Sequence, residues 1–79
     1  MPYITQSDRD RLTKGAVACG PGELNYLITR LIKPYLGSNP SYATINNVIG
    51  VLECAKLELY RRIAAPHEDE KCRVNGDVY

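Results

Sequence analysis

The fold of this chain is decided by residues 41–65, which read SYATINNVIGVLECAKLELYRRIAA. Apolar residues recur there at steps of three and four, a periodicity that predicts an amphipathic helix. The main stripe and the row beside it are formed by Tyr42, Ile45, Val48, Ile49, Leu52, Ala55, Leu59 and Ile63, and by Val51, Cys54 and Leu57. This apolar surface covers more than half of the circumference, which is more than one small partner helix buries. We expect the helix to end or bend at Pro66, because proline disfavours the helical conformation of the residue before it.

A second helix is predicted just before this one, over residues 21–37. Pro21 and Glu23 suit a first helical turn, since the amide that proline lacks has no partner there and an acidic side chain complements the positive helix end. The apolar stripe consists of Leu24, Leu27, Ile28, Leu31, Ile32 and Tyr35. Pro34 is expected to loosen the last turn, and Gly37 to end the helix in a left-handed conformation. Residues 38–41 then form a turn.

Shorter helices are predicted at both ends of the chain. Residues 8–14 are expected to be helical, started by a capping box from Ser7 to Asp10 and closed by Gly15. After Pro66, acidic residues precede basic ones in a segment that Asn75 and Gly76 end, which predicts a short last helix. No segment alternates like a strand. The predicted fold is therefore all-α: a helical hairpin of one medium and one long helix, with short N- and C-terminal helices, in a single domain over residues 1–79.

The length and composition exclude several classes of protein. With 79 residues and 8.8 kDa, the chain is too short for a Rossmann fold, a barrel enzyme or a two-domain clamp. A net charge of +1 does not suit a general nucleic-acid binder, whose affinity comes from many phosphate contacts. Three cysteines imply no set of disulfides, and neither a signal peptide nor an apolar membrane span is apparent. A reduced, cytoplasmic protein without membrane contact is expected.

Self-association is expected on energetic grounds. In a scaffold of this size, apolar burial and the entropy cost of ordering the chain nearly cancel. Neither a disulfide nor a metal supplies the missing stability, and the wide apolar face of residues 41–65 is the natural surface for contact between copies. A homodimer or a higher ring is predicted. The alternative is a compact monomer whose terminal segments cover that face.

The residues that could carry chemistry do not form a recognisable catalytic or metal site. His67 and Cys72 offer one ligand each where zinc takes four, and no motif places a nucleophile beside the histidine. Gly20-Pro21-Gly22 before a helix resembles a minimal phosphate cradle, but a plain helix start explains it better. We therefore expect no catalytic residue, no metal, no cofactor and no enzyme activity.

Two basic and aromatic clusters are the candidate ligand-binding residues. Tyr26, Arg30 and Lys33 share the second helix, beside Asn25 and Thr29, and such side chains stack on a base and hold a phosphate. Arg61 and Arg62 follow Tyr60 on the long helix, where the simpler explanation is an ion pair between Glu58 and Arg62 on a solvated surface. A helix-turn-helix is disfavoured because the long helix is too apolar and its basic pair lies at the wrong end, so no specific DNA binding is expected.

The residues also resemble a known family. The matching segments are Gly22 to Tyr26, Ile28 to Arg30, Ser41 to Asn46, Leu52 to Arg62, Ala65 with Pro66, and the closing NGDVY of residues 75–79. Together they resemble a family of small proteins without assigned function that tailed phages and prophages encode. The resemblance covers nearly the full chain and implies a phage accessory protein in the host cytoplasm. In that family the position of His67 is often tyrosine, which weakens a metal or acid–base role for it.

Two kinds of counter-defence function are compatible with such a protein. One is sequestration of a nucleotide signalling molecule at sites between the subunits of a homo-oligomer, because a protomer of this size does not enclose a ligand of several hundred Å3 by itself. The other is inhibition of a host defence protein by surface contact, to which exposed tyrosine and arginine are also suited. A minor structural or assembly component of the virion is a third possibility. Sequestration is the leading hypothesis, and residues 75–79 are expected to dock on a neighbouring subunit.

Overall fold

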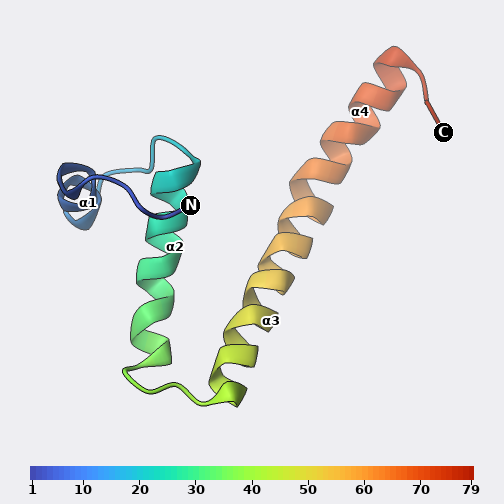
Figure 1. Ribbon diagram of the computed structural model, residues 1–79. Coiled ribbons are helices and arrows are strands. Elements are labelled where there is room, and N and C mark those ends of the chain that lie inside the picture. The colour runs from blue at the N-terminus through green and yellow to red at the C-terminus, as the bar shows by residue number, and fades with distance from the viewer. The chain divides into compact units, whose positions relative to one another are not determined.

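The computed structural model describes all residues from 1 to 79 and contains helices but no strands (Figure 1). The elements are α1 (Gln6–Thr13), α2 (Pro21–Leu36), α3 (Tyr42–Leu59), the π-helical turn η1 (Tyr60–Ala64) and α4 (Ala65–Asn75). The prediction of an all-α chain is confirmed. The chain divides into a first unit, Met1–Ser41, and a second unit, Tyr42–Tyr79. Pairing of α2 with α3 as a hairpin, and their union in one domain, stay predictions.

The first unit is built around one buried side chain. Leu12, on α1, is only 2 % exposed and is the sole large apolar residue that the chain buries this fully. Its helix, α1, packs beside α2 (Figure 1). Because no other residue of the chain reaches this burial, we expect Leu12 to make the largest single apolar contribution to the stability of this unit.

The start of α1 differs from the prediction by two residues. Thr5, not Ser7, caps the helix, because its hydroxyl oxygen accepts the backbone N–H of Asp8 at 3.2 Å. The same hydroxyl donates to the Asp8 carboxylate at 2.9 Å. Thr5 thus caps the helix and is linked to Asp8 by two hydrogen bonds, and this pair overlaps the predicted pair of Ser7 and Asp10. Gly15, with φ of 100°, closes the helix as predicted.

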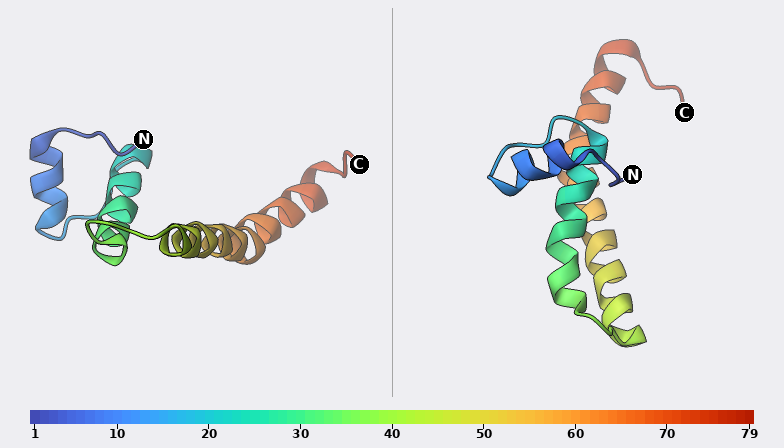
Figure 2. Two further views of the ribbon diagram at one scale, coloured as in Figure 1. Left: turned by 60° about the horizontal axis from the view of Figure 1, so that its bottom comes forward. Right: turned by 60° about the vertical axis from the view of Figure 1, so that its left-hand side comes forward.

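The N-terminal strap, residues 1–4, runs along the beginning of α2 (Figure 2). A Cβ atom added at Gly22 would lie 3.1 Å from the carbonyl oxygen of Met1 and 3.5 Å from a methyl carbon of Ile4. Such a short approach to a backbone atom is one that only glycine permits without a shift of the strap. The glycine in the first turn of α2 thus serves the close packing of the strap.

The ends of α2 agree with the prediction. Pro21 occupies the first helical position, and Pro34 lies in the last turn, which continues to Leu36. Gly37 has φ of 73°, and its N–H donates to the carbonyl of Lys33 at 3.1 Å. A left-handed residue that returns a hydrogen bond to the last turn is the usual end of such a helix.

The long helix is predicted to end or bend at Pro66, but the helical stretch does not end there and Ala65 keeps a helical conformation. The α-helical geometry already stops at Leu59, five residues form a π turn, and α4 continues from Ala65 through Pro66 to Asn75. In the wider turn the N–H of Ala65 donates to the carbonyl of Tyr60, five residues back. Pro66 lacks the backbone N–H that would donate to the carbonyl four residues earlier in an α-helix. A π turn is one way to accommodate this missing hydrogen bond. Pro66 then occupies the first turn of α4, where it is tolerated.

A side-chain bond spans the π turn. The hydroxyl of Tyr60 donates to a carboxylate oxygen of Glu68 at 2.6 Å, and this bond, together with the negative charge nearby, raises the pKa of the tyrosine. The helix ends at Gly76, whose φ is 91°, as the sequence predicted. From Tyr42 to Asn75 the second unit is thus one uninterrupted helical stretch (Figure 2).

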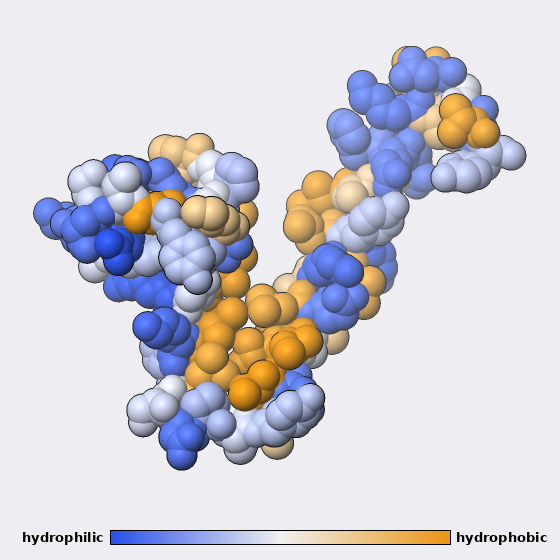
Figure 3. Space-filling model, in the orientation of Figure 1, coloured by the Kyte–Doolittle hydropathy of each residue, from blue (hydrophilic) through white to orange (hydrophobic).

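The second unit has no core of its own. None of its residues is buried, and Ile49, Leu57, Leu59 and Ile63 are each more than half exposed. Figure 3 shows apolar atoms along α3, whereas the end formed by α4 is mostly hydrophilic. Most of the stability of a helix in a protein comes from packing of its apolar face against other protein surface, so we expect this face to be packed in the functional state.

Candidate ligand-binding groove

The first unit contains a groove of about 350 Å3 between the N-terminal strap, α1 and α2. We call it the strap groove. It is lined by Pro2, Tyr3 and Ile4 of the strap, Arg9 of α1, and Tyr26, Thr29 and Lys33 of α2. Its volume lies at the small end of the range of small-molecule sites, about 300–1,000 Å3.

The strap groove is positively charged and contains no acidic side chain. Arg9 and Lys33 line it, and neither belongs to any of the ion pairs of the structure. The first unit carries five basic and three acidic residues, a net charge of +2. Two of the acids are engaged elsewhere, because Asp8 bonds to Thr5 and Asp10 accepts from the Gln6 amide at 2.8 Å. An anion in the groove would therefore meet two cations that have no competing partner.

Two tyrosines and a threonine supply the remaining polar surface. Tyr26 is half-buried on α2, whereas Tyr3 on the strap is 83 % exposed. The Thr29 hydroxyl donates to the carbonyl of Asn25 at 2.9 Å, so its oxygen is held one turn from Tyr26 and Lys33. Aromatic faces beside cations are the combination on which nucleotides stack and pair.

The structure brings together only some of the predicted ligand-binding residues. Tyr26 and Lys33 line the strap groove. Arg30 does not line the strap groove; it lines another hollow, of about 490 Å3, with Leu27, Leu31 and Pro34. Like Lys33, Arg30 is exposed and takes no part in an ion pair.

Arg61 and Arg62 belong to the second unit and are engaged there. Arg61 donates to both carboxylate oxygens of Glu58, at 2.9 and 3.0 Å, and Arg62 lies 3.7 Å from the same carboxylate. All three side chains are more than half exposed. The solvated ion pair expected for Glu58 is present, with Arg61 as its closer partner. A phosphate would have to displace Glu58 from these guanidinium groups.

Sequence reasoning missed Arg9 and Tyr3. They lie 17 or more positions before Tyr26 and reach it only because α1 and the strap fold back along α2. Helical spacing predicts which residues of one helix share a face, but it does not predict which residues of another segment lie beside them. The one available signal was Gly22, a small residue in a helical first turn, where a second segment can approach closely.

A cluster around Glu23 holds α1 against the start of α2. The Glu23 carboxylate accepts from the guanidinium of Arg11 and, at 3.0 Å, from the backbone N–H of Cys19. Arg11 also donates to the carbonyl of Val17 at 3.3 Å. The N–H of Cys19 and the attraction of Arg11 both lower the pKa of Glu23, since each stabilises the ionised carboxylate. An acidic side chain thus already satisfies the beginning of α2, which argues against a phosphate at Gly20 to Gly22.

The lowered pKa predicts a specific loss of stability in acid. The unfolded carboxylate titrates near 4.5 and the folded one below it. The stabilisation is therefore complete above about 4.5 and is lost as the pH falls through the folded value. Glu23→Gln should melt at a lower temperature than the wild type at pH 7, and this difference should shrink and disappear as the pH falls through the folded pKa of Glu23. Circular dichroism melts across this range measure it.

Glu53→Gln is the matched control for this prediction, because Glu53 pairs with Lys56 at 3.1 Å on an open helix surface. It should change the melting temperature little at any pH. A difference in melting temperature between Glu23→Gln and the wild type that stays constant throughout the acid titration would contradict the proposed linkage.

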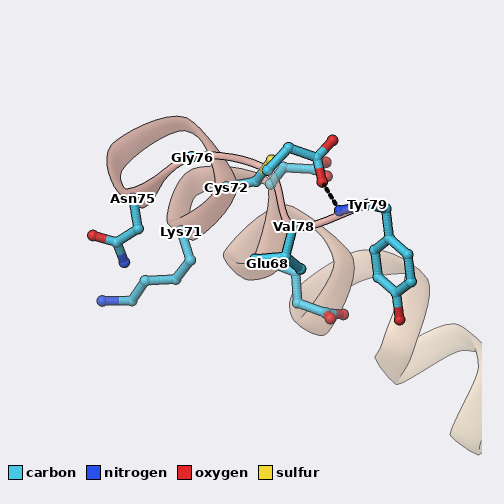
Figure 4. A pocket seen from close by; sticks show the side chains of 9 residues that line it. Glu68, Lys71, Cys72, Asn75, Gly76, Val78 and Tyr79 are labelled. Atoms are coloured by element: carbon cyan, nitrogen blue, oxygen red, sulfur yellow. Dashed lines mark hydrogen bonds between the residues drawn. The ribbon is translucent and has the colours of Figure 1, made fainter.

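A second hollow, of about 500 Å3, lies at the end of α4 (Figure 4). The chain turns at Gly76, and the N–H of Tyr79 donates to the Asp77 carboxylate at 2.9 Å. Three acidic residues, Glu68, Asp69 and Asp77, line the hollow against a single cation, Lys71. An anion is disfavoured there, so the strap groove is the better candidate for a phosphate ligand.

No group of three histidine, cysteine, aspartate or glutamate side chains is arranged to hold a metal ion. The three cysteines are free and exposed. No helix combines the length and the apolar character that crossing a bilayer requires.

The comparisons with known proteins identify a family but no function. The model of a family described as "Domain of unknown function (DUF6899)" matches residues 1–78. Neither a curated protein nor a solved structure matches the chain. The chemistry of the strap groove therefore has to be interpreted from its own residues.

Proposed function

We propose that this chain, which belongs to the DUF6899 family of domains of unknown function, binds a nucleotide in the strap groove and sequesters it. One observation carries the proposal: two cations without acidic partners, Arg9 and Lys33, line a groove that also contains Tyr3 and Tyr26 and no carboxylate. Phosphate would pair with the cations, and a base would stack on a tyrosine ring. Arg30 lines a different hollow of the same helix, so we propose it only as an additional phosphate contact for a ligand that extends beyond the groove.

The small volume of the groove bears on how a ligand would be enclosed. At about 350 Å3, it accommodates part of a nucleotide signalling molecule, and most of such a ligand is normally buried. We propose that a homo-oligomer completes the site between its subunits, and that α2 and α3 pair as a hairpin within each copy. Arg61 and Arg62 contribute if a partner subunit brings them near the ligand and Glu58 releases them.

The biological role that fits this activity is counter-defence. Some host defence systems are activated by a nucleotide messenger. A small phage accessory protein in the host cytoplasm would bind that messenger and keep it from the defence system. The closing NGDVY, which carries the family resemblance, supports the phage origin. Capture of a messenger requires side chains that bind it but no catalytic side chains. The strap groove offers two cations and two tyrosines for binding.

The test is a thermal melt of the purified chain with a panel of ligands. The panel contains cyclic dinucleotides, cyclic and linear mononucleotides, and inorganic pyrophosphate. A ligand at about 100 times its dissociation constant adds about 2.7 kcal/mol. For a domain of this size that raises the melting temperature by more than about 10 °C. We expect such a shift with at least one nucleotide and a smaller one with pyrophosphate, which cannot stack.

Two other outcomes would replace the proposal. The absence of a shift with every nucleotide, together with recovery of a host protein in a pull-down, would favour an inhibitor that acts by surface contact. Co-purification with phage particles would favour a structural or assembly component. Either result would refute sequestration in the strap groove.

A further inference from the structure

We propose that Tyr3 makes the strap groove specific for a base, and that one nucleotide unit lies in the groove with its base against Tyr26 and its phosphate at Lys33. This inference rests on the proposed function and deepens it, because it names the part of the ligand that the groove takes and the direction in which it lies. Three observations carry it: the order of the lining residues along α2, the place where the strap meets α2, and the turn that the strap forms.

The lining residues of α2 give the groove a direction. Tyr26, Thr29 and Lys33 follow one another at steps of three and four, so they lie on one face of the helix. Lys33 comes seven residues after Tyr26, which is about 10 Å along the helix axis. The groove therefore has an aromatic position and a cationic position on α2, with the Thr29 hydroxyl between them.

The strap meets α2 at the aromatic end of this face. The segment approaches Gly22 with the carbonyl oxygen of Met1 and a methyl carbon of Ile4. Gly22 lies one helical turn before Tyr26 and on the same face. Lys33 comes eleven residues after Gly22, about 16 Å along the helix. The strap therefore borders the groove nearer to Tyr26 than to Lys33.

The backbone of the strap presents Tyr3 at the tip of a turn. The N–H of Ile4 donates to the carbonyl of Pro2 at 3.0 Å, so these residues form a three-residue turn with Tyr3 in the middle. Pro2 and Ile4 are half-buried, whereas Tyr3 is 83 % exposed. The two neighbours hold the turn against the protein, and the ring of Tyr3 keeps an open face that a base can cover.

The distribution of charge sets which end takes the base. Lys33 is the only charged residue among the lining residues of the strap and α2, and Arg9 reaches the groove from α1. A phosphate placed at the uncharged strap end would lose hydration without meeting the lysine, whereas a base covers an aromatic ring favourably. The base is therefore expected between Tyr3 and Tyr26, with the phosphate at Lys33.

The experiment compares adenosine 5′-monophosphate with ribose 5-phosphate, which has the same sugar and phosphate but no base. Adenine serves as the probe because stacking on an aromatic ring tolerates any base. In titration calorimetry of the full chain, Tyr3→Ala should bind adenosine 5′-monophosphate at least about fivefold more weakly than the wild type. Its affinity for ribose 5-phosphate should be unchanged. Lys33→Gln should instead weaken both probes by about tenfold, because both carry the phosphate.

Tyr3→Phe and Tyr35→Ala are the matched controls. Tyr3→Phe keeps the aromatic ring and should bind both probes like the wild type. Tyr35 also belongs to α2 and is 63 % exposed, but it does not line the groove. Tyr35→Ala should therefore change neither affinity.

A fluorescence measurement reports the stacking itself. The chain contains no tryptophan, so Tyr3→Trp introduces a single one. Adenosine 5′-monophosphate should quench its emission, because a base stacked on an indole ring quenches fluorescence, and ribose 5-phosphate should not. Tyr35→Trp should respond to neither probe.

The failure of this inference can be told apart from the failure of the proposed function. If nucleotides raise the melting temperature but Tyr3→Ala binds adenosine 5′-monophosphate as tightly as the wild type, the role of Tyr3 is refuted and sequestration stands. Equal weakening of both probes by Tyr3→Ala would also refute that role, since the residue would then not act on the base. If no nucleotide raises the melting temperature of the wild type, sequestration is refuted and this inference with it.

Discussion

Replacing Leu12 with alanine is expected to detach α1 from α2 and to destroy the strap groove. Leu12 is 2 % exposed and is the one fully buried apolar side chain of the unit in which α1 packs beside α2. Truncation of a buried leucine costs about 2–5 kcal/mol. A unit of about 40 residues has a total stability of the same size, at about 0.05–0.15 kcal/mol per residue. Amide exchange should therefore lose its protection throughout residues 6–13.

The control for this experiment is Val17→Ala, since Val17 belongs to the same unit but is 83 % exposed. Its effect on the free energy of unfolding should stay within about 0.5 kcal/mol. If amides of α1 stay protected in Leu12→Ala, then the polar cluster of Arg11, Glu23 and Cys19 holds the helix without the leucine. That outcome would contradict the dependence of the α1–α2 contact on a single buried side chain.

Removing both cations of the strap groove is expected to abolish nucleotide binding. In the double variant Arg9→Gln with Lys33→Gln, a phosphate loses both charged partners. A hydrogen bond to a charged group contributes enough to affinity that each loss costs at least about tenfold. The dissociation constant should therefore rise about 100-fold or more, with the helix content unchanged because neither side chain belongs to an ion pair within the protein. Titration calorimetry with the nucleotide that gives the largest thermal shift measures the change.

The comparison for this variant is Arg61→Gln with Arg62→Gln, which removes the same charge from the second unit. Both arginines already contact Glu58, so we expect less than about a threefold loss of affinity. The reverse order, with the larger loss in the second unit, would place the ligand at Arg61 and Arg62 and would refute binding by the strap groove. Arg30→Gln tests whether this arginine, which lies outside the lining of the groove, also contacts the phosphate.

The helical character of the chain could be predicted because it depends on local interactions. The spacing of apolar residues, proline in a first turn and glycines at the ends of helices act within a few residues of one another, and they placed α2 to within one residue at its end. Pro66 shows where local reasoning fails. Proline is incompatible with an α-helical ladder, yet a π turn five residues long let the helix continue, and the Tyr60–Glu68 bond spans it.

The sequence by itself determined that this protein is helical, that its long helix carries a wide apolar surface, and that Tyr26 and Lys33 share a helix with Arg30. Those properties follow from periodicity along one helix. Only the tertiary structure decided which cations meet. Packing of α1 and the strap against Gly22 and Glu23 brings Arg9 and Tyr3 to Tyr26 and Lys33, whereas Glu58 retains Arg61 and Arg62. The physical reason is that a binding groove is formed between segments distant in sequence, and their contacts depend on packing that no single helix encodes.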